Sequence, residues 1–168
     1  MKFLDGIKIP TTQFVRAING ADYLPWATAV ALAGRPQQRV VTFEGQPMLA
    51  FFGGGIVGIE QEGQQVFLPV LAPNGAPVPA DRISPRDVGD ALMRCRAKAV
   101  ALVNGVGLSL YAGFGGDALG FLKTLGVKPD SDLSSAPSLQ RDKGGKGAEY
   151  VPWAAALAAA RITDPDFR

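Results

Sequence analysis

Histidine is absent from this chain of 168 residues, and cysteine occurs once, as Cys95. Without histidine the chain lacks the commonest general base and metal ligand, and it cannot build a serine–histidine or cysteine–histidine dyad. No set of spaced carboxylates suggests another catalytic chemistry. We therefore expect a protein that is not an enzyme and uses no cofactor or metal. A lone cysteine cannot form an internal disulfide, which is typical of a reducing cytoplasm.

Long apolar runs and a strong net charge are also missing. No stretch reaches the ~18 uninterrupted apolar residues of a membrane span, and the N-terminus lacks the apolar run of a signal peptide. We expect a cytoplasmic protein without a membrane partner. The net charge is +2, with 47% hydrophobic and 19% charged residues, which is a globular composition. Contact with nucleic acid would therefore need a local basic patch.

One long helix is predicted from residue 84 to residue 104. Ser84 suits the N-cap, Pro85 suits the first helical position, and Asp87 follows the cap by three residues, as in a capping box. Asn104 and Gly105 tolerate the left-handed conformation that ends a helix. Apolar residues at spacings of four and three form a single stripe that should face a core: Val88, Leu92, Cys95, Ala99 and Leu102.

Three basic residues, Arg94, Arg96 and Lys98, lie on this predicted helix. Arg94 and Lys98 are one turn apart and share a flank, while Arg96 leaves on the other side of the stripe. Charged groups near a core are costly unless they reach a partner, and an anion would serve. Two interpretations stay open: a nucleic-acid contact, or a solvated helix face on which Asp90 pairs with Arg94.

The remaining elements predict an α+β fold, with an antiparallel sheet of three or four strands packed on the long helix and an extra C-terminal helix. A helix should cover residues 22–33, entered at Pro25 and ended by Gly34. Turn-like separators indicate an antiparallel meander with strands at 39–43, 48–52, 56–60 and 65–71. After the basic helix we expect a short strand at 107–111, a helix at 117–125 and a final helix near 150–161.

The end of the chain repeats its beginning. Residues 20–35 and 147–162 share the pattern G-A-acid-Y-aliphatic-P-W-A. Both copies could be proline-entered helices anchored to a core by their aromatic residues, or one copy could dock in its own subunit and the other in a neighbour. The predicted organisation is a core at 1–125, a flexible linker at 126–147 and a C-terminal helix at 148–168. The aromatic anchors are Tyr23, Trp26, Tyr150 and Trp153.

Four groups of residues, in the same order along the chain, resemble the phage single-strand DNA annealing proteins of the Sak type. These proteins belong to a superfamily similar to the eukaryotic Rad-fifty-two annealing protein. The resemblance covers roughly residues 20–115. Its motifs are Y-L-x-W-A at 23–27, L-P-V at 68–70, D-A-L-x-R-C-x-x-K-A at 90–99 and G-L-x-L-Y-A-G at 107–113.

The resemblance implies ATP-independent binding of single-stranded DNA and annealing of complementary strands in phage-type homologous recombination, in the bacterial host cell. It also implies a homo-oligomer, a ring or helical filament, with DNA in a groove across subunits. A host single-strand-binding protein is a further partner that we expect. By position, Arg94 matches the family arginine and Lys98 the Sak-type lysine, whereas Arg96 stands where the pattern is usually apolar.

Other residues are weaker candidates for contact with DNA. Arg82 and Arg86 precede Arg94 on the same segment, and Tyr111 could stack on bases or pack in the core. The chain departs from its relatives after Leu71, where residues 72–75 replace a D-x-R-N-like turn. The alternative function is a multimeric phage structural or adaptor protein that does not bind DNA and uses the basic helix for ion pairs between subunits.

Overall fold

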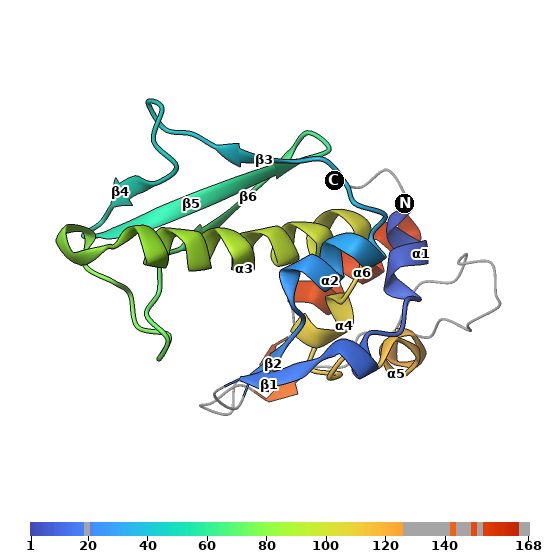
Figure 1. Cartoon of the computed structure of the whole chain (residues 1–168). Helices are drawn as coiled ribbons and strands as arrows, with labels where there is room; N and C mark the ends of the chain where they lie inside the picture. The colour runs from blue at the N-terminus through green and yellow to red at the C-terminus, as the bar shows by residue number, and fades with distance from the viewer. Residues whose placement is uncertain (19–20, 126–141, 144–148, 151–152, 165–168) are drawn as a thin grey trace. The chain divides into compact units, whose positions relative to one another are not determined.

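The computed structural model of the chain (Figure 1) describes residues 1–18, 21–125, 142–143, 149–150 and 153–164. These residues fall into two compact units, which are described separately. The first comprises Met1–Leu24 with Asn104–Arg168, and the second comprises Pro25–Val103. Among the described residues, no helix combines the length and the apolar character needed to cross a membrane.

The second unit is built on a four-stranded antiparallel sheet. Its strands are β3 (Gln38–Val41), β4 (Leu49–Phe51), β5 (Gly54–Gln61) and β6 (Gln64–Pro69), so the four predicted strands are confirmed. The predicted meander differs from the observed order, because β3 and β4 both pair with β5 and lie end to end along one of its edges. The strand β6 pairs with the other edge of β5.

A tight turn lies between β3 and β4, and the pairing across it is limited to one bridge, between Phe43 and Gln46. Phe43 and Gln46 exchange backbone hydrogen bonds of 2.8 and 2.9 Å, and Glu44 and Gly45 between them have φ values of 50° and 81°. The turn therefore closes over two residues and projects from the edge. The chain then returns to the same edge of β5 as β4.

The helix α3 (Pro85–Asn104) packs on this sheet, as predicted (Figure 1). Its stripe presents small residues, which allow close approach to the strands, while Val88, Leu92 and Leu102 are half-buried at the border. The Cys95 Sγ lies 3.1 Å from the Val66 carbonyl oxygen, and burial raises the pKa of this thiol to about 11. The shared core consists of Val57, Ile59, Val66, Val70, Ala91, Cys95 and Ala99.

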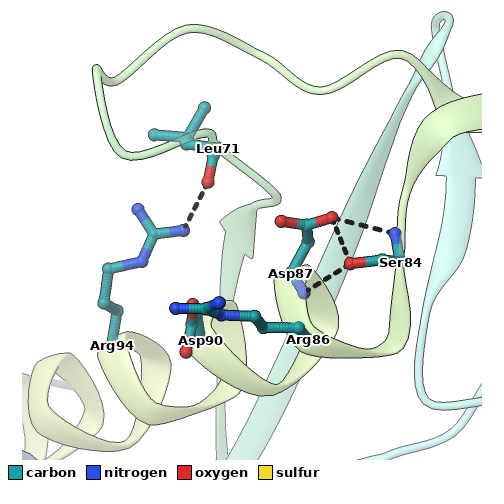
Figure 2. Close-up of polar contacts among 6 residues, drawn as sticks. All are labelled: Leu71, Ser84, Arg86, Asp87, Asp90 and Arg94. Atoms are coloured by element: carbon teal, nitrogen blue, oxygen red, sulfur yellow. Dashed lines mark hydrogen bonds and ion pairs between the residues drawn. The ribbon is translucent and has the colours of Figure 1, made fainter.

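The predicted capping box at the start of α3 is confirmed (Figure 2). The backbone N–H and the hydroxyl of Ser84 donate to Asp87 Oδ2 at 2.9 and 2.6 Å. In return, the Asp87 N–H donates to Ser84 Oγ at 3.3 Å. These hydrogen bonds from Ser84 lower the pKa of the Asp87 carboxyl below its ordinary value.

We expect Ser84→Ala to lower the urea midpoint of unfolding at pH 7, because the helix loses the hydroxyl of its cap. Since the pKa of Asp87 is lowered in the folded state, the contribution is complete above the ordinary pKa of ~3.9 and disappears as the pH falls through the folded pKa. The difference between variant and wild type should therefore shrink below about pH 4. Ser84→Thr keeps the hydroxyl and serves as the control. A Thr variant as unstable as the Ala variant would contradict this account.

The predicted helix at 22–33 begins later than expected. Residues Ala21–Tyr23 form β2, which pairs with β1 (Arg16–Ile18), and α2 covers only Trp26–Leu32. The reason is Pro25, which disfavours helical backbone at the preceding residue and itself serves as the N-cap. Gly34, with a φ of 80°, follows the helix end as predicted.

The predicted strand at 107–111 is wrong, because Leu108–Tyr111 forms the helical turn α4. Gly105 and Gly107 both have positive φ values, 80° and 74°, so the chain turns sharply after α3. The Ala112 N–H then donates to the Leu108 carbonyl oxygen. Leu108 and Ser109 are both buried, whereas a half-buried strand would place neighbours on opposite faces.

The first unit also contains α1 (Phe3–Ile7), the 3-10 turn Thr12–Phe14, α5 (Ala118–Thr124) and α6 (Trp153–Thr163). The predicted helices at 117–125 and near 150–161 are thus confirmed. Asp117 caps α5 by accepting a hydrogen bond from the Gly120 N–H. Of the predicted linker, only β7 (Asp142–Lys143) lies within the described residues, where it pairs with β8 (Glu149–Tyr150). The division into core, linker and C-terminal helix stays a prediction.

Candidate nucleic-acid interface

Arg94 is half-buried on α3 and faces the loop that follows β6 (Figure 2). Its Nη2 donates to the Leu71 carbonyl oxygen at 3.5 Å, which is long for a hydrogen bond. A guanidinium carries five N–H donors in a planar fork, so this weak contact orients the group while leaving it able to bind an anion. Arg94 therefore keeps further N–H donors beyond the one that contacts Leu71.

The predicted alternative for Arg94, an ion pair with Asp90, is not what the structure contains. Asp90 Oδ2 instead lies 3.9 Å from Arg86 Nε (Figure 2). Both side chains are highly exposed, 89% for Arg86 and 68% for Asp90, so this pair contributes little to stability. The acid nearest in sequence to Arg94 is thus directed toward Arg86.

The stretch around Leu71 and the stretch that follows Asp90 contain no acidic residue. Residues 63–80, which include Leu71, contain no charged side chain, and residues 91–116 contain no aspartate or glutamate. Lys98 lies one turn after Arg94 on the same flank and is half-buried as well. We call Arg94 and Lys98 the basic flank of α3. Its positive potential is not offset by an acidic residue in either stretch.

Arg96 lies on the other side of the helix and is held by neighbours within its own unit. Its guanidinium carbon is 5.8 Å from the centre of the Trp26 ring, and its Nη1 donates to Gln38 Oε1 at 3.3 Å. Gln38 Nε2 donates to the Arg96 carbonyl oxygen at 3.0 Å and to Gln61 Oε1 at 2.7 Å. Because Gln61 is fully buried, this network joins α2, α3 and the sheet. It gives Arg96 a structural role.

The weaker basic candidates lie where charges of both signs mix. Arg82 ends the 3-10 turn Ala80–Arg82 and is exposed, and Arg86 lies in the first turn of α3. Asp81, Asp87 and Asp90 lie in the same stretch. Local charge there is therefore close to balanced.

The aromatic candidate Tyr111 belongs to the first unit. It is 38% exposed on α4, and its ring centre lies 5.3 Å from that of Trp153. Of the other predicted anchors, Tyr23 on β2 is half-buried and Trp26 lies beside Arg96. The side chain of Tyr150 lies outside the described residues.

Two groups of residues were missed in the sequence. Phe51 and Phe52 stand at the β4–β5 turn with ring centres 4.4 Å apart, and Phe52 is 94% exposed with a φ of 46°. They border an apolar hollow of about 340 Å³ that is also lined by Pro69 and Val70. The expected strand at 48–52 hid this turn, although the three glycines after Phe52 were a signal for it. Arg16 is exposed on β1, in a stretch, residues 1–19, whose sequence carries no clear pattern.

The comparisons with known proteins agree with the motifs in the basic helix and the sheet. A family model described as Sak Single Strand Annealing Protein matches residues 17–146. No curated protein and no solved structure matches the chain. The family match covers most of the 168 residues and runs from within β1 to beyond α5. The chain therefore belongs to the Sak single strand annealing protein family.

Proposed function

We propose that this protein binds single-stranded DNA through its sugar–phosphate backbone and anneals complementary strands without ATP during phage-type homologous recombination. The observation that carries the proposal is the basic flank of α3, where Arg94 and Lys98 lie in stretches free of acidic residues. Membership of the Sak family supports the same function. We place this activity in the cytoplasm of the bacterial host cell.

Binding through phosphates suits annealing for a physical reason. Phosphate contacts position a strand without reading its sequence, so the bases stay available to search for their complement. Pairing then forms only hydrogen bonds and stacking contacts between the strands. The protein has no bond to make or break, so the mechanism requires neither a catalytic group nor ATP.

Self-assembly into a ring or helical filament is part of the proposal. The net charge is only +2, and the two cations of the basic flank would give a salt slope of roughly 1.4 per subunit for a single strand. One subunit would therefore bind weakly. Repetition of the basic flank along an oligomer converts weak contacts into tight binding through effective concentration. A host single-strand-binding protein is a further partner that we propose on the family resemblance alone.

The direct test is annealing of two complementary oligonucleotides that carry a donor and an acceptor fluorophore, without ATP. We expect the full-length protein to accelerate the rise in energy transfer well above the spontaneous rate, for unrelated sequences alike. Pairing at the spontaneous rate, together with no binding of a single strand, would contradict the proposal. That result would favour a multimeric structural or adaptor protein.

Arg96 should behave differently from the basic flank. We expect Arg96→Ala to destabilise the protein by about 1–2 kcal/mol, because it removes the contacts with Trp26 and Gln38. Its affinity for single-stranded DNA should change less than about twofold, since the group lies in the internal network. Urea unfolding and fluorescence anisotropy measure the two effects. If Arg96→Ala loses as much affinity as Arg94→Ala, then the Arg96 guanidinium contacts DNA.

A further inference from the structure

The two copies of the repeated sequence fold in the same way locally. In the first copy β2 ends at Tyr23 and α2 begins at Trp26, and in the second β8 ends at Tyr150 and α6 begins at Trp153. The first copy lies within the family match, whereas the second begins at residue 147, directly after that match ends. The second copy therefore lies outside the residues that the family model matches.

The helix α6 packs against α1 and α4 of the first unit. We call the surface of α1 and α4 that it contacts the seat. The Trp153 ring contacts the Tyr111 ring at 5.3 Å, and the Arg161 guanidinium carbon lies 4.3 Å from the centre of the Phe3 ring. Ala154 and Ala158 are fully buried on this face. The structure thus identifies a surface of this chain that binds the repeated sequence.

The two helices bury opposite faces of the same sequence. The positions of Ala154 and Ala158 correspond to Ala27 and Ala31 in the first copy, which are also alanines but are exposed. The helix α2 instead buries Ala29, at 1%, while its counterpart Ala156 is exposed on α6. Residues two apart lie about 200° apart around a helix. Therefore α2 presents the positions of Ala154 and Ala158 to solvent, while Thr28 and Leu32, at the positions of the buried Ala155 and Ala159, are half-buried.

We propose that the seat on α1 and α4 also binds the exposed face of α2 from a second copy of this chain, and that α6 is a built-in competitor that limits self-assembly. The partner is a second copy because α2 carries the same aromatic and alanine pattern that the seat already binds. The inference rests on the self-assembly in the proposed function and assigns one contact of it.

Differences between the copies explain why α6 holds the seat within its own chain. Gly34 stands at the position of Arg161, so α2 lacks the guanidinium that lies over Phe3. Thr28 and Leu32 replace Ala155 and Ala159 and are larger than the alanines that the seat accommodates. The helix α6 also has the advantage of effective concentration. A neighbouring α2 should therefore enter only when α6 leaves or when copies are concentrated.

The test compares Ala158→Arg with its repeat equivalent Ala31→Arg in the full-length protein without DNA. A charge at the buried Ala158 should expel α6, and we expect the mean assembly mass by light scattering to rise at least about twofold, since each freed seat recruits another copy. Ala31→Arg adds the same charge to an exposed alanine and should not raise the mass. In the double variant the gain should be lost, because α2 can no longer dock.

Arg161→Ala keeps the test decisive if Ala158→Arg fails to fold by circular dichroism. It removes the guanidinium that lies over Phe3 without placing a charge in the buried face and should raise the mass by a smaller amount. An unchanged mass in a folded Ala158→Arg variant, or in Arg161→Ala where the first variant does not fold, would overturn the inference. A gain that persists in the double variant would also overturn it. Failure to bind or anneal DNA would contradict the proposed function. It would not change these assembly masses, which are measured without DNA.

Discussion

Arg94→Ala is expected to weaken binding of a single-stranded oligonucleotide by about tenfold or more, because a hydrogen bond to a charged group is worth about 1.5–3 kcal/mol. The weak contact with Leu71 means that little folding stability is lost with the side chain. The loss recurs in every subunit that touches the strand, so long oligonucleotides should show a larger effect than short ones. Fluorescence anisotropy at fixed salt, with oligonucleotides of two lengths, measures this.

The matched control is Arg86→Ala, which removes the same charge about two turns away on the same helix. Arg86 is 89% exposed and already lies beside Asp90, so its loss should change the affinity by less than about twofold. Equal losses in the two variants would show that only net charge matters. The basic flank would then have no specific role. Urea unfolding of both variants confirms that neither effect comes from a damaged fold.

The largest effect on stability is expected from Gly105→Ala. Gly105 has a φ of 80°, and a Cβ there would collide with the carbonyl oxygen of Phe3 and come within 2.9 Å of Ile7 Cγ1. Left-handed backbone costs a non-glycine residue about 1–2 kcal/mol, and overpacking adds about 1–3 kcal/mol. We therefore expect a loss of about 3 kcal/mol in the free energy of unfolding.

Gly113→Ala separates the two causes of that loss. Gly113 has nearly the same φ, 84°, but a Cβ there would meet nothing within 4 Å. Both glycines belong to the same compact unit. The control should lose only about 1 kcal/mol, the cost of the backbone conformation. Urea unfolding that gives equal losses for the two variants would show that Gly105 does not pack against α1.

The parts of the fold that could be predicted depend on local signals. The capping box at Ser84 and the apolar stripe through Cys95 predict α3 and its buried face, because both follow from helical spacing. The start of α2 and the turn α4 could not be predicted in the same way. Tyr23 lies in a strand because it pairs with Arg16 of β1. Leu108 is buried in the first unit together with its neighbour Ser109.

The candidate site shows the same limit. The sequence places Arg94, Arg96 and Lys98 within five residues, and their types do not distinguish their roles. The distinction depends on Gln38, which lies on β3, 58 residues before Arg96 in the sequence, and accepts a hydrogen bond from it. The exposure of Phe52 likewise depends on a turn that the strand pattern concealed. Sequence spacing therefore identifies the basic helix, and tertiary contacts distinguish Arg96 from Arg94 and Lys98.

The most direct test of the central claim is the salt dependence of single-strand binding by the assembled full-length protein. If phosphates are held by the repeated basic flank, the logarithm of the binding constant should fall linearly with the logarithm of salt concentration, with a slope of roughly 1.4 per subunit for the two cations of the flank. The slope should be the same for unrelated base sequences. A binding constant that hardly responds to salt, or one set by base sequence, would contradict the account.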